Sequence, residues 1–186
     1  SRLRDLLKVK TVALLLGWAL LCVLVLNWSQ LSRPIRYWIT HTIEIDGLVY
    51  HLNPDDKFIS ATMVWSGTWE PTERSVLRTH LRPGDTFVDV GAYIGYYTVL
   101  ASQLVGRNGR VIAFEPDPEN FALLKRNVEA NGCTNVTLEQ RALSNQPGKI
   151  ELFLDPKSKG SHSIIEFAGA ESTVEVEALP LDDYLS

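Results

Sequence analysis

The chain has 186 residues, which allows one domain plus an appendage. Its hydrophobic share of 45% and charged share of 22% are those of a globular protein, and the net charge of -4 gives no electrostatic reason to expect a nucleic acid partner. The two cysteines and four histidines are not arranged with zinc-ligand spacing, so no metal site is predicted.

The N-terminus combines a basic flank with an apolar run. Residues 1–10 are rich in Arg and Lys, and residues 11–28 are almost wholly apolar, which is about the length of a membrane-spanning helix. We therefore predict a single-pass membrane protein anchored through residues 11–28, with a cytoplasmic N-terminus and a linker over residues 29–41. A signal peptide that is cleaved before secretion is the alternative.

The domain expected over residues 42–186 begins with a hairpin. Two alternating apolar segments, 42–45 and 48–52, flank Asp46-Gly47, a dipeptide that favours a tight hairpin turn. Residues 72–81 follow as a predicted helix whose inner stripe consists of Val76, Leu77 and Leu81.

The pattern of residues 86–98 predicts a buried strand, a glycine turn and the start of a helix. This arrangement suits a nucleotide-like ligand. The spacing from Gly91 to Gly95 is Gly-x-x-x-Gly, which differs from the dinucleotide fingerprint. Asp89, at the carboxyl end of the strand, would repel a pyrophosphate but could pair with the amino group of an amino acid. S-adenosylmethionine combines a nucleoside with an amino acid and has no phosphate. An ordinary strand–turn–helix with structural glycines is the alternative.

A second carboxylate supports a nucleoside ligand. Residues 111–114 predict the next strand, and Glu115 follows it a little over 20 residues after Gly91. Because neighbouring strand ends of such a unit lie side by side, Glu115 could accept hydrogen bonds from both ribose hydroxyls. The alternative is that Glu115 is an exposed acid in front of a helix. Asp117 is predicted to cap that helix.

The remaining elements complete the predicted sheet. Residues 136–138 predict a third strand, and the loop from Gln140 to Ala142 is a weaker candidate for contact with adenine, with plain loop residues as the alternative. Two strands are expected at 150–154 and 173–179, the second with Val174, Val176 and Ala178 inward. A polar, mobile loop over 157–163 separates them; it could act as a lid, with a plain connecting loop as the alternative. A turn or helix is expected from Pro180.

Several of these segments, in this order, resemble the FkbM family of S-adenosylmethionine-dependent methyltransferases, from about Ile43 to the end of the chain. The segments that carry the resemblance are Arg82-Pro83-Gly84-Asp85, residues 88–98, Gly109-Arg110-Val111-Ile112-Ala113-Phe114-Glu115-Pro116, Ala142-Leu143-Ser144 and Leu181-Asp182-Asp183-Tyr184. The family pattern usually has Asn where this chain has Tyr93.

The resemblance implies an α/β fold with the Rossmann-like sheet of class I methyltransferases, and methyl transfer from S-adenosylmethionine to an oxygen. The acceptor would be a small molecule, glycan or lipid, such as a sugar, a glycolipid or a polyketide natural product. The residues expected to bind the cofactor are Asp89, Gly91, Ala92, Tyr93, Gly95, Glu115, Pro116 and Ala142.

Three further expectations concern the C-terminus of the domain, the catalytic base and the alternative functions. Members of the family continue beyond the Leu-Asp-Asp segment into another core strand, so we expect a domain that is truncated at its C-terminus, with an unpaired edge along Phe87–Val90. No catalytic base is assigned among the candidates Glu70, His162, Asp182 and Asp183. A non-catalytic interaction module and a nicotinamide-dependent oxidoreductase are the alternative functions.

Overall fold

The computed structural model describes residues 17, 28–170 and 172–185. Apart from Gly17 and Trp28, the predicted membrane anchor over residues 11–28 lies outside the described residues. Among the residues that are described, no helix is both long enough and apolar enough to cross a membrane.

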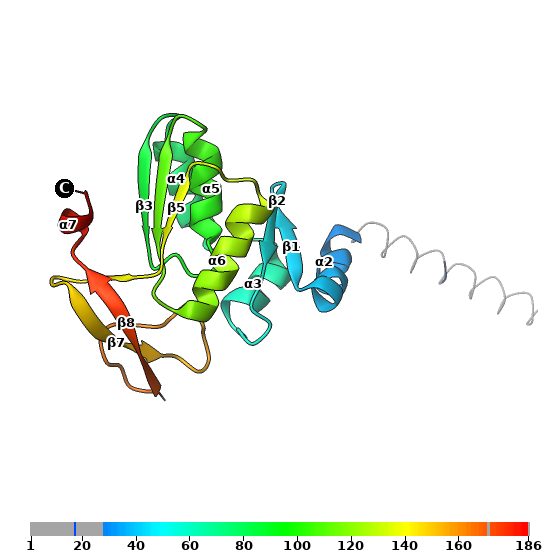
Figure 1. Ribbon diagram of the computed structural model, residues 1–186. Coiled ribbons are helices and arrows are strands. Elements are labelled where there is room, and N and C mark those ends of the chain that lie inside the picture. The colour runs from blue at the N-terminus through cyan, green and yellow to red at the C-terminus, as the bar shows by residue number, and fades with distance from the viewer. Residues whose placement is uncertain (1–16, 18–27, 171, 186) are drawn as a thin grey trace, which may run out of the picture.

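A parallel three-stranded sheet forms the centre of the fold. Its strands are β3 (Thr86–Val90), β4 (Arg110–Phe114) and β5 (Val136–Glu139), in the order β3-β4-β5. The helices α5 (Tyr96–Val105) and α6 (Pro118–Ala130) connect consecutive strands and cover one face of this sheet (Figure 1). The α/β fold that the resemblance implies is thereby confirmed.

The register of the sheet brings the ligand-binding candidates to one edge. Val90 pairs with Phe114 and Asp89 pairs with Ala113, so β3 and β4 end side by side. The residues that follow them, Gly91 and Glu115, therefore emerge at the same edge. Within the described residues β3 pairs with β4 alone.

A second sheet follows in sequence. Its strands are β6 (Ala142–Leu143), β7 (Gly148–Leu154) and β8 (Ser172–Leu179), in the order β6-β8-β7, with β7 antiparallel to β8 (Figure 1). Leu152, Val176 and Ala178 are buried in a small core of its own. The predicted inward alternation of β8 is confirmed, since Val176 and Ala178 are buried and Val174 packs half-buried against the same cluster.

The N-terminal hairpin is formed by β1 (Thr42–Ile45) and β2 (Leu48–His51), as predicted. Asp46 and Gly47 have φ angles of 51° and 77°, the left-handed conformations that such a tight turn requires. The segment expected to be a linker differs from the prediction, since it contains the helix α2 (Trp28–Thr40). Pro34 favoured a linker there, because proline inside a helix removes a backbone donor.

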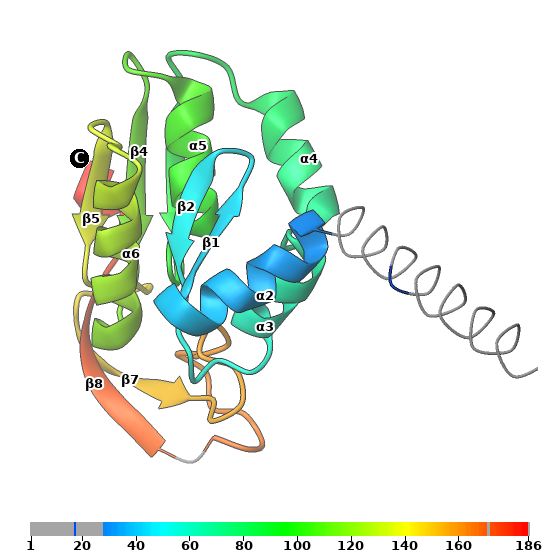
Figure 2. The ribbon, with the colours of Figure 1, turned by 90° about the vertical axis from the view of Figure 1, so that its right-hand side faces the viewer.

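Asn127 of α6 and Asn131, the C-cap residue that follows the helix, attach the hairpin to α6. The amide of Asn127 accepts from the N–H of His51 at 2.6 Å and donates to its carbonyl oxygen at 3.0 Å. One turn further, Asn131 makes the same pair of bonds to Val49. The side chains thus satisfy the backbone groups on the outer edge of β2, a task that a neighbouring strand usually performs. Figure 2 shows the hairpin between α6 and α4.

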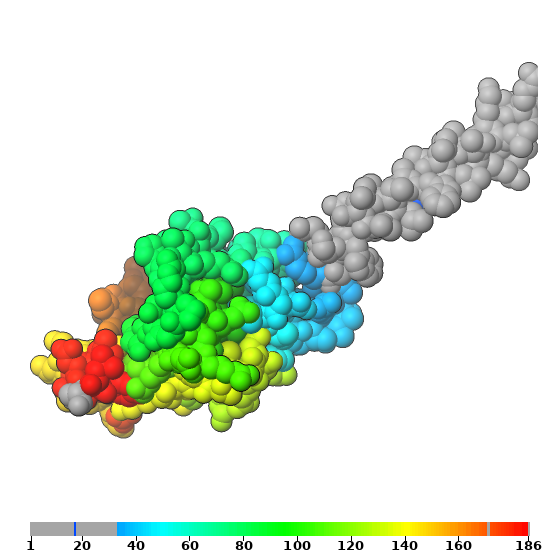
Figure 3. Space-filling view, turned by 90° about the horizontal axis from the view of Figure 1, so that it is seen from above, coloured from blue at the N-terminus to red at the C-terminus, as the bar shows by residue number. Residues whose placement is uncertain are grey.

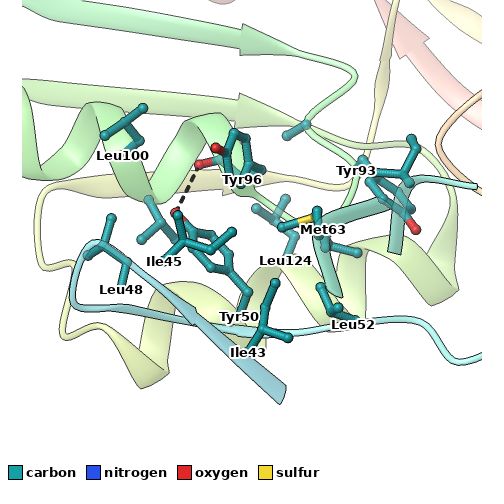
Figure 4. Packing of buried hydrophobic residues seen from close by; sticks show 14 of the residues in the cluster. Ile43, Ile45, Leu48, Tyr50, Leu52, Met63, Tyr93, Tyr96, Leu100 and Leu124 are labelled. Atoms are coloured by element: carbon teal, nitrogen blue, oxygen red, sulfur yellow. Dashed lines mark hydrogen bonds between the residues drawn. The ribbon is translucent and has the colours of Figure 1, made fainter. Parts of the chain in front are cut away.

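The main hydrophobic core lies between the hairpin and the helices of the central sheet. Figure 4 shows Ile43, Tyr50, Met63, Tyr96 and Leu124 converging there, with the Tyr50 hydroxyl donating to the carbonyl oxygen of Tyr96 at 3.4 Å. This core therefore combines residues from before and after the glycine turn.

Two helices lead from the hairpin to the central sheet. The first, α3 (Ile59–Ser66), was not predicted. The Asp56 carboxylate caps it by accepting from the N–H groups of Phe58, Ile59 and Ser60. Gly67, with a φ angle of 73°, ends it. The capping acid and the terminal glycine are sequence signals that could have identified this helix.

The second helix, α4 (Pro71–His80), confirms the predicted helix over 72–81 within a residue at each end. The prediction that Val76 faces inward is wrong, since its side chain is 49% exposed. Leu77 is half-buried against the main core, and Leu81 is half-buried against a separate cluster of Ala101, Val105 and Val111. Arg78 on this helix donates to the Asp46 carboxylate at 2.7 Å, so the hairpin turn holds the polar side of α4.

The chain ends in the short helix α7 (Leu181–Leu185), which lies on the side of the sheet opposite α5 and α6 (Figure 1). Tyr184 packs edge-on against Phe114 with 5.1 Å between ring centroids, and its hydroxyl donates to Glu139 at 3.0 Å. Helix α7 and the N-terminal elements lie at opposite ends of the folded body (Figure 3).

Candidate functional site

The glycine turn is fixed to the end of the neighbouring strand. The N–H groups of Gly91 and Ala92 both donate to the carbonyl oxygen of Phe114, each at 2.9 Å. Gly91 has a φ angle of 74°, a conformation that glycine adopts without steric penalty. This turn places the backbone of residues 91–93 directly beside Glu115.

Glu115 is held in one orientation by two backbone amides. Its Oε2 accepts from the N–H of Tyr93 at 2.7 Å, and its Oε1 accepts from the N–H of Asp117 at 3.0 Å. The residue is 5% exposed, and this burial raises the pKa of the carboxyl group to about 7. Each carboxylate oxygen retains a further lone pair, so Glu115 can accept hydrogen bonds from two ligand donors.

A first cavity of about 270 Å³ opens where β4 and β5 end. Four of the predicted binding residues line it: Gly91, Glu115, Pro116 and Ala142. Its other lining residues are Val90, Phe114, Asn120, Arg141, Leu143, Leu152, Lys159, Gly160, His162, Ser163 and Ile164. The weaker candidate Arg141 thus borders the cavity and pairs with Glu139, whereas Gln140 does not border it.

Asn120 contributes a buried acceptor to the first cavity that the sequence did not indicate. Its amide nitrogen donates to the carbonyl oxygen of Lys159 at 2.8 Å, while its Oδ1 has no hydrogen-bond partner. The residue is only 2% exposed. Because an unpaired buried acceptor is unfavourable, a ligand donor at this position would stabilise the site.

A second cavity of about 250 Å³ lies on the other side of Gly91. Gly91 and Gly160 border both cavities, so one extended ligand could occupy both. The predicted residues Ala92 and Tyr93 line the second cavity. The remaining lining residues are Phe58, Ile59, Met63, Trp69, Glu70, Ile94, Tyr96, Tyr97 and Ser161.

Two predicted binding residues line neither cavity. Asp89 is buried and its Oδ2 accepts from the Thr98 hydroxyl at 2.5 Å, so it fastens the end of β3 to α5. Burial raises the pKa of the Asp89 carboxyl. Gly95 has a φ angle of 84° at the start of α5, and a Cβ there would lie 2.6 Å from Leu124 Cδ1. Both residues therefore support the glycine turn through contacts with α5 and α6 and do not border a cavity.

Tyr93 occupies a conformation that is unusual for its residue type. Its φ angle is 52°, in the left-handed region that Asn tolerates better than an aromatic residue. The Tyr93 hydroxyl donates to Asp56 Oδ2 at 2.7 Å, and Asp56 in turn caps α3. The Tyr93 side chain therefore connects the glycine turn to the N-terminal region.

The loop over residues 157–163, which the sequence predicted to be mobile, contacts the site at several points. Lys159 accepts from Asn120, and Gly160 packs so closely that a Cβ would lie 2.4 Å from Ile59 Cδ1. The backbones of Phe153 and Ser163 form a bridge at its end. This loop closes one side of both cavities.

The candidate bases differ in position. His162 lines the first cavity, but its Nδ1 accepts from the N–H of Asp155 at 3.0 Å, which places the proton of the neutral ring on Nε2. Burial lowers the pKa of His162. Glu70 lines the second cavity, whereas Asp182 and Asp183 line neither. Among the described residues, no group of three or more His, Cys, Asp or Glu could hold a metal ion.

Comparison with known proteins places the chain among methyltransferases. Residues 89–186 match a family model described as the methyltransferase FkbM domain. The chain is 30% identical over 113 residues to a probable cobalt-precorrin-6B C(15)-methyltransferase (decarboxylating) of Sulfolobus acidocaldarius, covering 61% of this chain and 59% of that protein. It is 39% identical over 59 residues to protein-L-isoaspartate O-methyltransferase 1 of Arabidopsis thaliana, covering 32% and 26%.

Among solved structures, M. jannaschii TYW2 in complex with AdoMet is similar, with a TM-score of 0.43, 18% identity, and coverage of 57% of this chain and 51% of that one. The chain thus spans 59% or less of the length of these relatives.

Proposed function

We propose that this chain, which belongs to the FkbM methyltransferase family, binds S-adenosylmethionine across its two cavities and transfers the methyl group to a hydroxyl oxygen. S-adenosylmethionine is the methyl donor of the family. The observation that carries the proposal is the Glu115 carboxylate, which two backbone amides hold at the edge of the first cavity, beside Gly91.

The first cavity suits a nucleoside without phosphate groups. Glu115 can accept from both ribose hydroxyls, and the apolar residues Pro116, Ala142 and Leu143 offer surfaces for a base. The two cations at its margin, Arg141 and Lys159, are paired with Glu139 and Glu119. This arrangement, together with the Gly-x-x-x-Gly spacing, disfavours the pyrophosphate of a nicotinamide cofactor.

The bound cofactor supplies a methyl group that is already activated by the sulfonium charge. The task of the protein is then to orient the acceptor in line with the carbon–sulfur bond and to exclude water. Residues 157–163 and the Gly91–Tyr93 turn border the two cavities and would contribute to both tasks.

The acceptor that we propose is a sugar, glycolipid or natural-product hydroxyl. Support comes from the family resemblance and from the aromatic side chains of the second cavity. Phe58 is 60% exposed there and packs edge-on against Trp69, with 6.0 Å between ring centroids. Exposed aromatic faces of this kind pack well against sugar rings.

The chemistry of the methylated product tests this acceptor class. The full chain, incubated with S-adenosylmethionine carrying a radiolabelled methyl group and with glycolipid and glycan extracts, should yield a label that resists mild alkali and is released by hydriodic acid, as expected of a methyl ether. Release by mild alkali would reveal a methyl ester, and resistance to both reagents would reveal methylation of carbon. Either result contradicts hydroxyl methylation.

We also propose that residues 11–28 anchor the protein in a membrane as a single-pass segment, with the N-terminus cytoplasmic. Support comes from the apolar sequence and from an exposed apolar stripe on α2, where Ile35, Trp38 and Ile39 are 57%, 81% and 67% exposed at helical spacing.

The expected result is that the full chain remains in the membrane pellet after alkaline carbonate extraction. A Leu20→Arg/Leu24→Arg variant should move to the supernatant, because charges within the apolar run oppose insertion. Release of the unmodified chain by carbonate would contradict the anchor.

A further inference from the structure

The second cavity has the composition of a cation site. Glu70 provides the only charged side chain among its lining residues, and Trp69, Tyr96 and Tyr97 contribute aromatic walls. Glu70 is exposed, and a carboxylate beside aromatic rings is well suited to a positively charged ligand group, because both the charge and the ring faces attract it. The first cavity, by contrast, is bordered by cations as well as by Glu115.

The Glu70 carboxylate is held in place without being neutralised. Its Oε2 accepts from the Tyr97 hydroxyl at 2.6 Å. Within the described residues, no Lys, Arg or His forms an ion pair with it. Its backbone adopts a left-handed φ angle of 41° directly before Pro71, a conformation that is unfavourable for a residue with a side chain. Strain of this kind is often found where a side chain must be held for binding.

Asp89 is another acid near the glycine turn, but its carboxylate is not accessible to a ligand in either cavity. Its carboxylate is buried against Thr98 and lines neither cavity. The carboxylate that faces the cavity beyond Gly91 is therefore that of Glu70. Glu70 also lies outside residues 89–186, the segment that matches the family.

We infer that Glu70 pairs with the α-ammonium group of the cofactor's methionine moiety, and that Tyr97 positions the carboxylate. The inference rests on the proposed function, which places the nucleoside in the first cavity and so directs the amino acid portion past Gly91 into the second. The ligand class for the second cavity is thus the zwitterionic end of an S-adenosyl amino acid, recognised through its cation.

Two ligands in which the sulfur is an uncharged thioether can separate the contact between Glu70 and the α-ammonium group from the other contacts of the ligand. S-adenosylhomocysteine and 5′-methylthioadenosine share adenine, ribose and a thioether, but the second lacks the ammonium and carboxylate groups. Calorimetric titration of the full chain should show that Glu70→Gln weakens S-adenosylhomocysteine binding about tenfold while leaving 5′-methylthioadenosine binding unchanged. Tyr97→Phe should weaken the same ligand by a smaller factor, about threefold, because the carboxylate remains but is no longer held.

Glu73→Gln is the matched control, since Glu73 is an exposed acid on the first turn of α4 and lines neither cavity. It should bind both ligands as the parent does. The inference is overturned if Glu70→Gln binds S-adenosylhomocysteine as tightly as the parent, or if it weakens both ligands equally, which would assign a structural role. It is also overturned if turnover falls while the dissociation constants stay unchanged, because Glu70 would then act on the acceptor. Failure of the parent to bind either ligand would instead refute the proposed function.

Discussion

Replacement of Glu115 by Gln is expected to weaken binding of S-adenosylmethionine about 100-fold at pH 8, because two hydrogen bonds to a charged acceptor are lost or weakened. The carboxylate is fixed by the N–H groups of Tyr93 and Asp117, so its position in the first cavity does not depend on the ligand. Isothermal titration calorimetry on the full chain measures the effect. Glu129→Gln, which changes an exposed acid at the end of α6, should bind as the parent does.

The pH dependence of the same titration provides a second check. Because burial raises the pKa of Glu115 to about 7, the parent should bind more tightly as the pH rises from 6 to 8 and the carboxyl group ionises. The stability of the ligand-free chain should change in the opposite direction. A folded pKa above the ordinary value of 4.5 stabilises the protein at low pH, and this contribution is lost as the pH rises through about 7. The Gln variant should lack the contribution of Glu115 to both dependences, and an equal pH profile for both proteins would contradict the assigned role.

The Gly95→Ala substitution is expected to destabilise the domain by about 3 kcal/mol. The left-handed φ angle of 84° penalises any side chain by about 1 kcal/mol, and the new Cβ would lie 2.6 Å from Leu124 Cδ1 in the main core, which adds about 2 kcal/mol of overpacking. Urea unfolding followed by circular dichroism measures the free energy of unfolding.

Gly132→Ala separates the two contributions. Gly132 has a similar φ angle of 61°, but no atom lies within 4 Å of the position that its Cβ would take. Its substitution should destabilise the domain by only about 1 kcal/mol, from the backbone alone. Equal losses for the two variants would show that the contact between the glycine turn and α6 is not tightly packed.

The elements that the sequence predicted well are those with strong local signals. The hairpin around Asp46-Gly47, the parallel strands ending at Val90 and Phe114, and the helix capped by Asp117 all carry turn, strand or capping residues at defined positions. The predicted cofactor, S-adenosylmethionine, followed from the acid and glycine spacing and agrees with the family match.

Other features depend on tertiary contacts that no local pattern encodes. The hydrogen bonds from Asn127 and Asn131 to β2 join segments 76 to 82 residues apart. Neither the residue types nor their spacing in the sequence predicts these bonds. Asp89 was predicted to face the ligand because of its place at a strand end. Its orientation depends on Thr98, in the first turn of α5, which offers a nearer partner.

The residues that distant segments contribute to the lining of the two cavities were equally hidden. Lys159 borders the first cavity because the β7–β8 connection folds back onto the start of α6, where Asn120 donates to its carbonyl oxygen. In the sequence, Glu70 was one of four candidates for the catalytic base that could not be told apart. In the structure, its hydrogen bond with Tyr97 distinguishes it.

Calorimetric titration of S-adenosylmethionine into the folded full chain, with NAD as the competing ligand, tests the central claim most directly. Saturable binding of S-adenosylmethionine with a one-to-one stoichiometry, and no heat of binding with NAD, is the result that the two cavities around Gly91 predict. A folded chain that binds NAD, or that binds neither ligand, would contradict the assignment of these cavities to the methyl donor.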